Sequence, residues 1–344
     1  MRLFFSLALA TSVIGSKECV PYGYPPVTAA LSHFPPIWRP VRAILSSDSA
    51  GHSRFLEFSS SIPNIAPKVH KQTSWFFSQT SQGTLGVLSG KSYPSSDPDC
   101  WWTYSTCVSP KLKGLKPDIA SPRTLGYGFD DGPNCSHNAF YDYLNKQNQK
   151  ATVFFIGSNV LDWPKEAQRA VADGHEICVH TWSHSYMTAF TNEQAFAELW
   201  YTMQAIKLVT GYTPTCWRPP SGDVDDRIRY IAARLGLDTI LWKYNTNDWE
   251  VGINGVTPAT VQANYDALVA AARKGTFNTK GAIILAHELN NYTMQTAMNN
   301  YPQLAQAFDH IVPIAVAQNK THPYVETNLS MPTFAQYVGS HKKS

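Results

Sequence analysis

The sequence lacks the features that mark membrane-spanning and nucleic-acid-binding proteins. Beyond the first fifteen residues, no segment approaches the ~20 consecutive apolar residues that a helix needs to cross a bilayer. Only 15% of the residues are charged, and the net charge of +3 comes from interspersed basic and acidic side chains. The one basic run is the tail His341-Lys342-Lys343, which a solvated terminus explains. We therefore expect neither a transmembrane segment nor a nucleic-acid partner.

The chain also lacks any C-x-x-C pair, which argues against a structural zinc site. Its cysteines are even in number, as suits disulfides in an oxidising compartment. Their pairing stays open except for one local bond that we predict, between Cys100 and Cys107. The six cysteines are Cys19, Cys100, Cys107, Cys135, Cys178 and Cys216.

The N-terminus has the pattern of a secretory signal peptide. Met1-Arg2 gives a positive start, residues 3–10 are apolar, and small residues end the segment near Gly15. The alternative is a buried N-terminal strand. The C-terminus shows no hydrophobic tail of the lipid-anchor type. We expect residues 1–15 to be a signal peptide and the protein to be secreted, to the extracellular space or the cell wall.

Glycosylation sequons agree with this route. Because Asn134 lies beside a cysteine and near the site discussed below, we expect it to be the least occupied. The four sequons begin at Asn134, Asn291, Asn319 and Asn328.

Residues 16–123 show no sustained hydrophobic period and are rich in proline, serine and glycine. We predict an irregular N-terminal extension that packs on, or is tethered to, the main domain. Within it, Trp101-Trp102 is either a sugar-stacking platform or a packing pair, and packing is favoured because such pairs more often simply pack.

Residues 124–318 alternate between short apolar runs and longer helical patterns, which predicts parallel strands joined by crossover helices. About seven strands indicate an α/β fold built on a distorted, incomplete (β/α) barrel, followed by a C-terminal tail, 319–344. The predicted strands are 125–129, 152–156, 176–179, 215–217, 239–242, 282–285 and 311–314. The predicted helices are 136–147, 164–173, 193–209, 225–235, 258–274 and 295–309.

Polar residues follow the carboxyl ends of these strands, at the rim where barrel active sites assemble. Polar residues with only structural roles have no reason to share this placement, so it indicates a functional site. The residues at these ends are Asp130, His180, Arg218, Asp248 and His287.

Two of these clusters contain metal-ligand chemistry. Asp130-Asp131 could be only a turn, and His180 with His184 could be only structural. Together, one carboxylate and two imidazoles make a three-ligand zinc set with an open position for water, and the second carboxylate can serve as a base. Thr181 stands where a metalloprotease H-E-x-x-H motif needs glutamate.

The remaining clusters supply further groups. Arg218 is either an ordinary salt-bridge residue or the partner of a catalytic carboxylate. Gly222 allows backbone amides to approach a ligand. His287 could be a core residue, but a carboxylate beside it, Asp248, would favour the imidazolium and therefore a general acid.

The order of the clusters resembles the polysaccharide deacetylase family, also called the NodB-homology or carbohydrate esterase 4 family. The similarity covers residues 125–317. Its motifs T-F-D-D-G-P, H-[ST]-x-x-H, R-P-P-aromatic-G, D-x-x-D-W and L-x-H are matched at 128–133, 180–184, 218–222, 245–249 and 285–287. The flanking sequence is most similar to chitin deacetylases of basidiomycete fungi.

This resemblance implies roles for the first groups. Asp131, His180 and His184 would bind a divalent metal, usually Zn²⁺ with Co²⁺ as a substitute. Asp130 would be the base, and Arg218 would orient it.

It also implies the groups that face the substrate. His287 would be the acid, tuned by Asp248. The backbone amide of Ser221 would help to stabilise the oxyanion, and Trp249 and Leu285 would line the groove around the acetyl methyl.

Two departures from the family motifs stand out. Ser221 replaces an aromatic residue, which removes a sugar-contacting wall while leaving the backbone amide. Asn245 replaces an acidic residue, and we expect little effect because Asp248 is retained.

The expected function is metal-dependent hydrolytic N-deacetylation of N-acetylglucosamine residues in chitin, which gives chitosan and acetate. The alternatives are deacetylation of another polysaccharide, such as xylan or peptidoglycan, or of soluble chitooligomers. A non-catalytic cell-wall carbohydrate-binding protein is the rival from another class. The sequence leaves the oligomeric state open.

Overall fold

The computed structural model describes residues 18–68, 93–108 and 118–341. The predicted signal peptide lies outside these residues. No helix in the described ranges is long and apolar enough to cross a bilayer.

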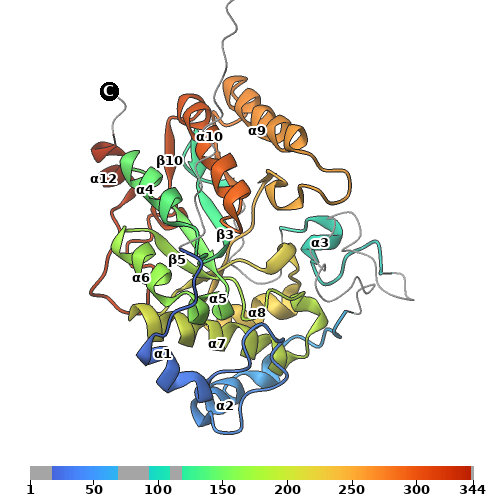
Figure 1. Ribbon diagram of the computed structural model, residues 1–344. Helices are drawn as coiled ribbons and strands as arrows, with labels where there is room; N and C mark the ends of the chain where they lie inside the picture. Colours follow the sequence, from blue (N-terminus) through green and yellow to red (C-terminus); the bar gives the residue numbers. More distant parts are fainter. Residues whose placement is uncertain (1–17, 69–92, 109–117, 342–344) are drawn as a thin grey trace, which may run out of the picture.

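The strands form two mostly parallel sheets, and the chain passes directly from the first sheet to the second (Figure 1). The chain leaves the first sheet after β2 (Thr124–Gly126) and enters the second at β3 (Gly128–Gly132). The second sheet has the order β3-β4-β5-β6-β7, with β4 (Thr152–Phe155), β5 (Glu176–Val179), β6 (Cys216–Trp217) and β7 (Asp238–Thr239). The first has the order β1-β9-β2-β10 with β8 on β9, where the bounds are β1 (Asp118–Ile119), β8 (Tyr244–Asn245), β9 (Gly281–Leu285) and β10 (His310–Val312).

An isolated parallel bridge between Asp130 and His287 connects the two sheets. Within the described residues no strand pairing joins β7 to β8, so the barrel stays open there. The predicted incomplete barrel is therefore confirmed. Each predicted strand overlaps an observed one. The strands β1 and β8 were not predicted, because neither lies in a run of apolar residues.

The central strands are buried on both sides. The side chains of Val153 and Phe154, which are neighbours in β4 and point to opposite faces of the sheet, have no exposed surface. Each buried side chain of this size stabilises the fold by about 1.5–3 kcal/mol. Burial on both faces explains why these strands appear as continuous apolar runs in the sequence.

Helices surround the strands on the outside (Figure 1). All six predicted helices are present, and local signals set their ends. The longest begins after a capping box of Thr191 with Gln194 and ends at Gly211, which has φ 84°. The predicted helices are α4 (Asn138–Lys146), α6 (Pro164–Ala172), α7 (Asn192–Thr210), α8 (Asp226–Arg234), α9 (Pro258–Arg273) and α10 (Asn291–Ala307).

Some helices were missed or begin elsewhere. The last predicted helix begins four residues earlier than expected, because the Asn290 side chain caps it. Several short helices were not predicted from the sequence. They are α1 (Pro25–Ala30), α2 (Ser49–Leu56), α3 (Trp102–Ser105), α5 (Gly157–Asp162), α11 (Ile314–Ala317) and α12 (Phe334–Ser340).

The first part of the N-terminal extension, which contains α1 and α2, packs on α7. The backbone N–H of Val41 donates to the buried carboxylate of Glu198 at 2.9 Å, and that of Leu45 donates to the Tyr201 hydroxyl at 2.8 Å. Figure 1 shows α1 and α2 beside α7, at one end of the molecule. The described part of the extension is thus attached along its length rather than tethered at one point.

Three disulfides connect all the cysteines. The predicted bond between Cys100 and Cys107 is confirmed. Cys19–Cys135 ties the start of the described chain to the segment after β3. Cys178–Cys216 joins the neighbouring strands β5 and β6.

Candidate active site

The strand ends bring the predicted residues together at one rim. Asp130 and Asp131 lie in β3, His180 follows β5, Arg218 follows β6 and His287 follows β9 by two positions. Because β3, β5, β6 and β9 run in parallel ladders and β3 bridges β9, their carboxyl ends meet.

An irregularity in β3 lets two successive aspartates serve the same site. Neighbouring residues of a regular strand point to opposite faces. Here the register with β4 shifts between Asp130 and Gly132, and Asp131 has φ 74°. This bulge redirects the Asp131 side chain, so both carboxylates lie near the His180 ring.

Asp131, His180 and His184 form a compact ligand set. The Asp131 Oδ1 atom lies 3.4 Å from His180 Nε2 and 3.1 Å from His184 Nε2. One ligand atom from each of the three residues lies within 4.8 Å of the others. Burial alone would raise the pKa of Asp131, but the two neighbouring imidazoles outweigh it and hold that pKa well below its usual value.

Two observations fit this set to a divalent cation. Asp131 Oδ1 is buried and has no hydrogen-bond partner among the described residues, which is costly unless a cation satisfies it. The Nδ1 atom of His180 lies 2.8 Å from the Arg218 carbonyl oxygen, and a proton on Nδ1 leaves Nε2 as a lone-pair donor. Two imidazoles and a carboxylate with an open position are the ligands of catalytic zinc sites.

Asp130 is held by a buried guanidinium. Arg218 Nη1 donates to Asp130 Oδ1 at 2.7 Å, and neither side chain is more than 3% exposed. The Arg218 guanidinium stacks 4.0 Å from the Phe154 ring centroid. Burial lowers the pKa of Arg218, while the charge of Asp130 opposes this shift. The other Asp130 oxygen is 3.8 Å from His180 Nε2, so the fixed carboxylate borders the ligand set.

His287 and Asp248 form the second buried pair. His287 Nδ1 lies 2.6 Å from Asp248 Oδ1. Burial acts to lower the pKa of His287, but the Asp248 carboxylate overrides this and raises it to about 9. The imidazolium therefore persists at neutral pH, as a general acid requires.

The predicted groove residues lie at or after the ends of β6, β8 and β9. Leu285 is the buried last residue of β9, and the Trp249 ring is half-buried with its centroid 6.4 Å from that of His287. Ser221 is half-buried in the tight turn Pro220–Gly222, with φ 54°.

Sequence reasoning missed Tyr186, a half-buried aromatic residue whose hydroxyl hydrogen-bonds to the Ser221 side chain. It also gave no role to Asp223, whose buried carboxylate accepts hydrogen bonds from Trp101 and Thr188. Both contacts join segments far apart in the chain, so no local pattern could have indicated them.

Trp101 is fully buried and Trp102 is 8% exposed, so the packing interpretation of this pair is confirmed. The Asn134 side-chain amide donates to the Leu289 carbonyl oxygen at 2.6 Å, so the nitrogen that would carry a glycan is already hydrogen-bonded.

Comparison with known proteins agrees with this geometry. Residues 119–240 match the family described as polysaccharide deacetylase. The chain is 49% identical over 341 residues to chitin deacetylase 2 of Cryptococcus neoformans var. grubii, covering 97% of this chain and 71% of that protein. It is 42% identical over 328 residues to a chitin deacetylase of Amylomyces rouxii, covering 93% and 75%.

Solved structures share the fold. The peptidoglycan deacetylase PdaC from Bacillus subtilis is 25% identical, with a TM-score of 0.50, covering 59% of this chain and 92% of that one. The chitin deacetylase from Colletotrichum lindemuthianum is 21% identical, with a TM-score of 0.53, covering 61% and 91%. The fold and the extended sequence identity lead to the same conclusion: the chain belongs to the polysaccharide deacetylase family.

Proposed function

We propose that this protein is a secreted, metal-dependent N-deacetylase that acts on N-acetylglucosamine residues of chitin and gives chitosan and acetate. One observation carries the proposal: the largely buried ligand set of Asp131, His180 and His184 lies beside Asp130, a carboxylate that Arg218 holds in place. The names of the relatives above support chitin as the substrate.

The bound metal would be Zn²⁺, held by Asp131, His180 and His184, with Co²⁺ as a functional substitute. It would supply a Lewis acid that polarises the acetamide carbonyl and lowers the pKa of the attacking water. The orphaned Asp131 oxygen supports this assignment.

The protein's own groups divide the proton transfers. Asp130, fixed by Arg218, accepts a proton from the attacking water while the water oxygen bonds to the carbonyl carbon of the acetyl group. The backbone N–H of Ser221 donates to the carbonyl oxygen as negative charge develops there. His287, kept protonated by Asp248, donates a proton to the amine nitrogen as the C–N bond breaks. Acetate and a free amine are the products.

Trp249 and Leu285 would form the wall around the acetyl methyl, since both lie next to His287 in space or in sequence. The three disulfides support a secreted or cell-wall location.

Acetate release from chitin, N-acetylglucosamine oligomers, peptidoglycan and acetylated xylan, each with and without a chelator, tests the proposal. We expect release from the first two substrates, loss on chelation and recovery with Zn²⁺. Release from xylan or peptidoglycan alone would contradict the chitin assignment. No release from any substrate would favour a non-catalytic wall-binding protein.

A further inference from the structure

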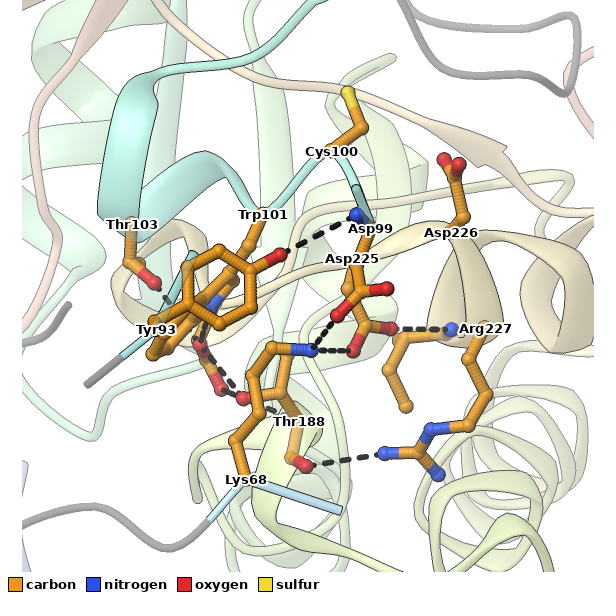
Figure 2. A network of polar contacts seen from close by, with 12 residues as sticks. Lys68, Tyr93, Asp99, Cys100, Trp101, Thr103, Thr188, Asp225, Asp226 and Arg227 are labelled. Carbon is orange, nitrogen blue, oxygen red and sulfur yellow. Dashed lines mark hydrogen bonds and ion pairs between the residues drawn. The ribbon is translucent and has the colours of Figure 1, made fainter. Parts of the chain in front are cut away.

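A fully buried carboxylate, Asp223, joins three separate segments of the chain. Its Oδ1 atom accepts a hydrogen bond from Trp101 Nε1 at 2.8 Å and one from the Thr103 hydroxyl at 3.1 Å, both in the N-terminal extension. Its Oδ2 atom accepts from the Thr188 backbone N–H at 2.8 Å. Figure 2 shows Trp101, Thr103 and Thr188 converging on one point.

Asp223 closes the turn that contains Ser221. The N–H of Asp223 donates to the Pro220 carbonyl at 2.9 Å, which completes the turn. Ser221 and Gly222 both have left-handed backbones, with φ 54° and 69°. Such a conformation is costly for serine, so surrounding contacts must hold it.

The extension also covers the turn from outside. A Cβ atom on Gly222 would lie 2.3 Å from the Trp102 ring, which shows how closely the indole lies against the backbone. The Trp102 backbone N–H donates to the Val224 carbonyl at 3.0 Å. Residues 222–224 are therefore fixed by contacts from both Trp101 and Trp102.

The same network reaches the loop that contains His184. Thr188, four positions after His184, accepts hydrogen bonds at its carbonyl from the Lys68 N–H at 2.8 Å and from Arg227 Nη2 at 3.0 Å. The buried Lys68 ammonium pairs with Asp225 at 2.5 Å and with Asp99 at 3.2 Å (Figure 2). These cations offset the negative charge of the buried carboxylates.

We infer that Asp223 is a positioning residue for the deacetylation. Its hydrogen bonds hold the extension and the His184 loop against the turn that contains Ser221. This inference rests on the proposed function. An amide that stabilises developing negative charge must be in place before the reaction, and a small displacement reduces catalysis. Residues 101–103 of the extension thereby help to position that amide.

The sharpest test is Trp101→Phe in the full-length protein, since it keeps an aromatic ring but removes the N–H donor together with part of the buried indole. We expect kcat to fall about tenfold, less than the ~100-fold typical of deleting an oxyanion donor. KM and bound zinc should stay near wild type, and amide hydrogen exchange over residues 219–224 should become faster.

Trp200→Phe is the matched control. It likewise removes an indole N–H between the extension and the main domain, here the one that Trp200 on α7 donates to Asp48 of the extension at 2.9 Å, away from the turn. We expect kcat and exchange at 219–224 to be unchanged. Thr103→Val and Thr103→Ser form a second pair: the first should lower kcat and the second should restore it, because only serine keeps the hydroxyl.

If Trp101→Phe had the kcat of the wild type, or unchanged amide hydrogen exchange at residues 219–224, the positioning role of Asp223 would be excluded. A comparable loss of kcat in Trp200→Phe would also overturn it, because any loosening of the extension would then suffice. If the wild-type protein released no acetate, the proposed function would fail, and the exchange rates would still decide whether Trp101 holds the turn.

Discussion

The Asp248 carboxylate holds both the ring and the backbone of His287. One oxygen lies 2.6 Å from His287 Nδ1, and the other accepts the His287 backbone N–H at 3.0 Å. A single side chain therefore sets the charge, the tautomer and the position of the proposed acid.

The interaction between Asp248 and His287 should make the stability of the fold depend on pH. The pKa of His287 is raised from 6.5 to about 9, so the folded state binds the proton more tightly than the unfolded state. The stabilisation, up to about 3 kcal/mol, is complete below pH 6.5 and is lost as the pH rises through about 9. The melting temperature of the metal-free, chelated protein should fall over this pH range in the wild type, and fall much less in Asp248→Asn. Equal declines in the two proteins would contradict the coupling.

The same substitution should move the activity profile. In Asp248→Asn the imidazolium loses its main stabilising charge, so the alkaline limb of the kcat profile should shift to lower pH. Because the two groups are coupled, the limb reports the pair rather than His287 alone. A limb that does not move would show that another group controls it.

His287→Ala should separate the acid from the metal site. The variant should keep its fold and bound zinc, since His287 is outside the ligand set, while kcat falls by at least ~100-fold through loss of the proton donor. Elemental analysis and acetate release measure the two effects. Substantial activity on chitin oligomers would reduce His287 to a groove residue.

The metal assignment predicts linked losses. Asp131→Ala and His184→Ala should each lose bound zinc and activity together, because each removes one of three ligands. Chelation should abolish wild-type activity reversibly. Full activity in protein that elemental analysis shows to be metal-free would exclude the metal mechanism.

Asp130→Asn distinguishes the base from the ligands. Asparagine keeps the shape and can still accept the Arg218 hydrogen bond, but it cannot take a proton. Turnover should fall by at least ~100-fold, while zinc content stays near wild type. If zinc is lost instead, the roles of Asp130 and Asp131 are exchanged.

Much of the fold could be predicted because its signals are local. Buried parallel strands such as Thr152–Phe155 are short apolar runs, and the reactive side chains follow directly after them. The bulge that turns Asp131 toward His180 depends on a register shift against β4, which no periodicity indicates. The hydrogen bond between the Trp101 indole and the Asp223 carboxylate joins residues 122 positions apart, so only the folded chain brings them together.

Three residues of the site have a left-handed backbone, which matters for engineering. They are Asp131, His184 and Ser221, with φ of 74°, 53° and 54°. Each such non-glycine residue costs on the order of 1 kcal/mol or more. Glycine would relieve that cost but would remove a ligand at the first two positions. Thermostable variants should therefore be sought on outer helices such as α9, and selection for heat resistance alone would favour inactive proteins.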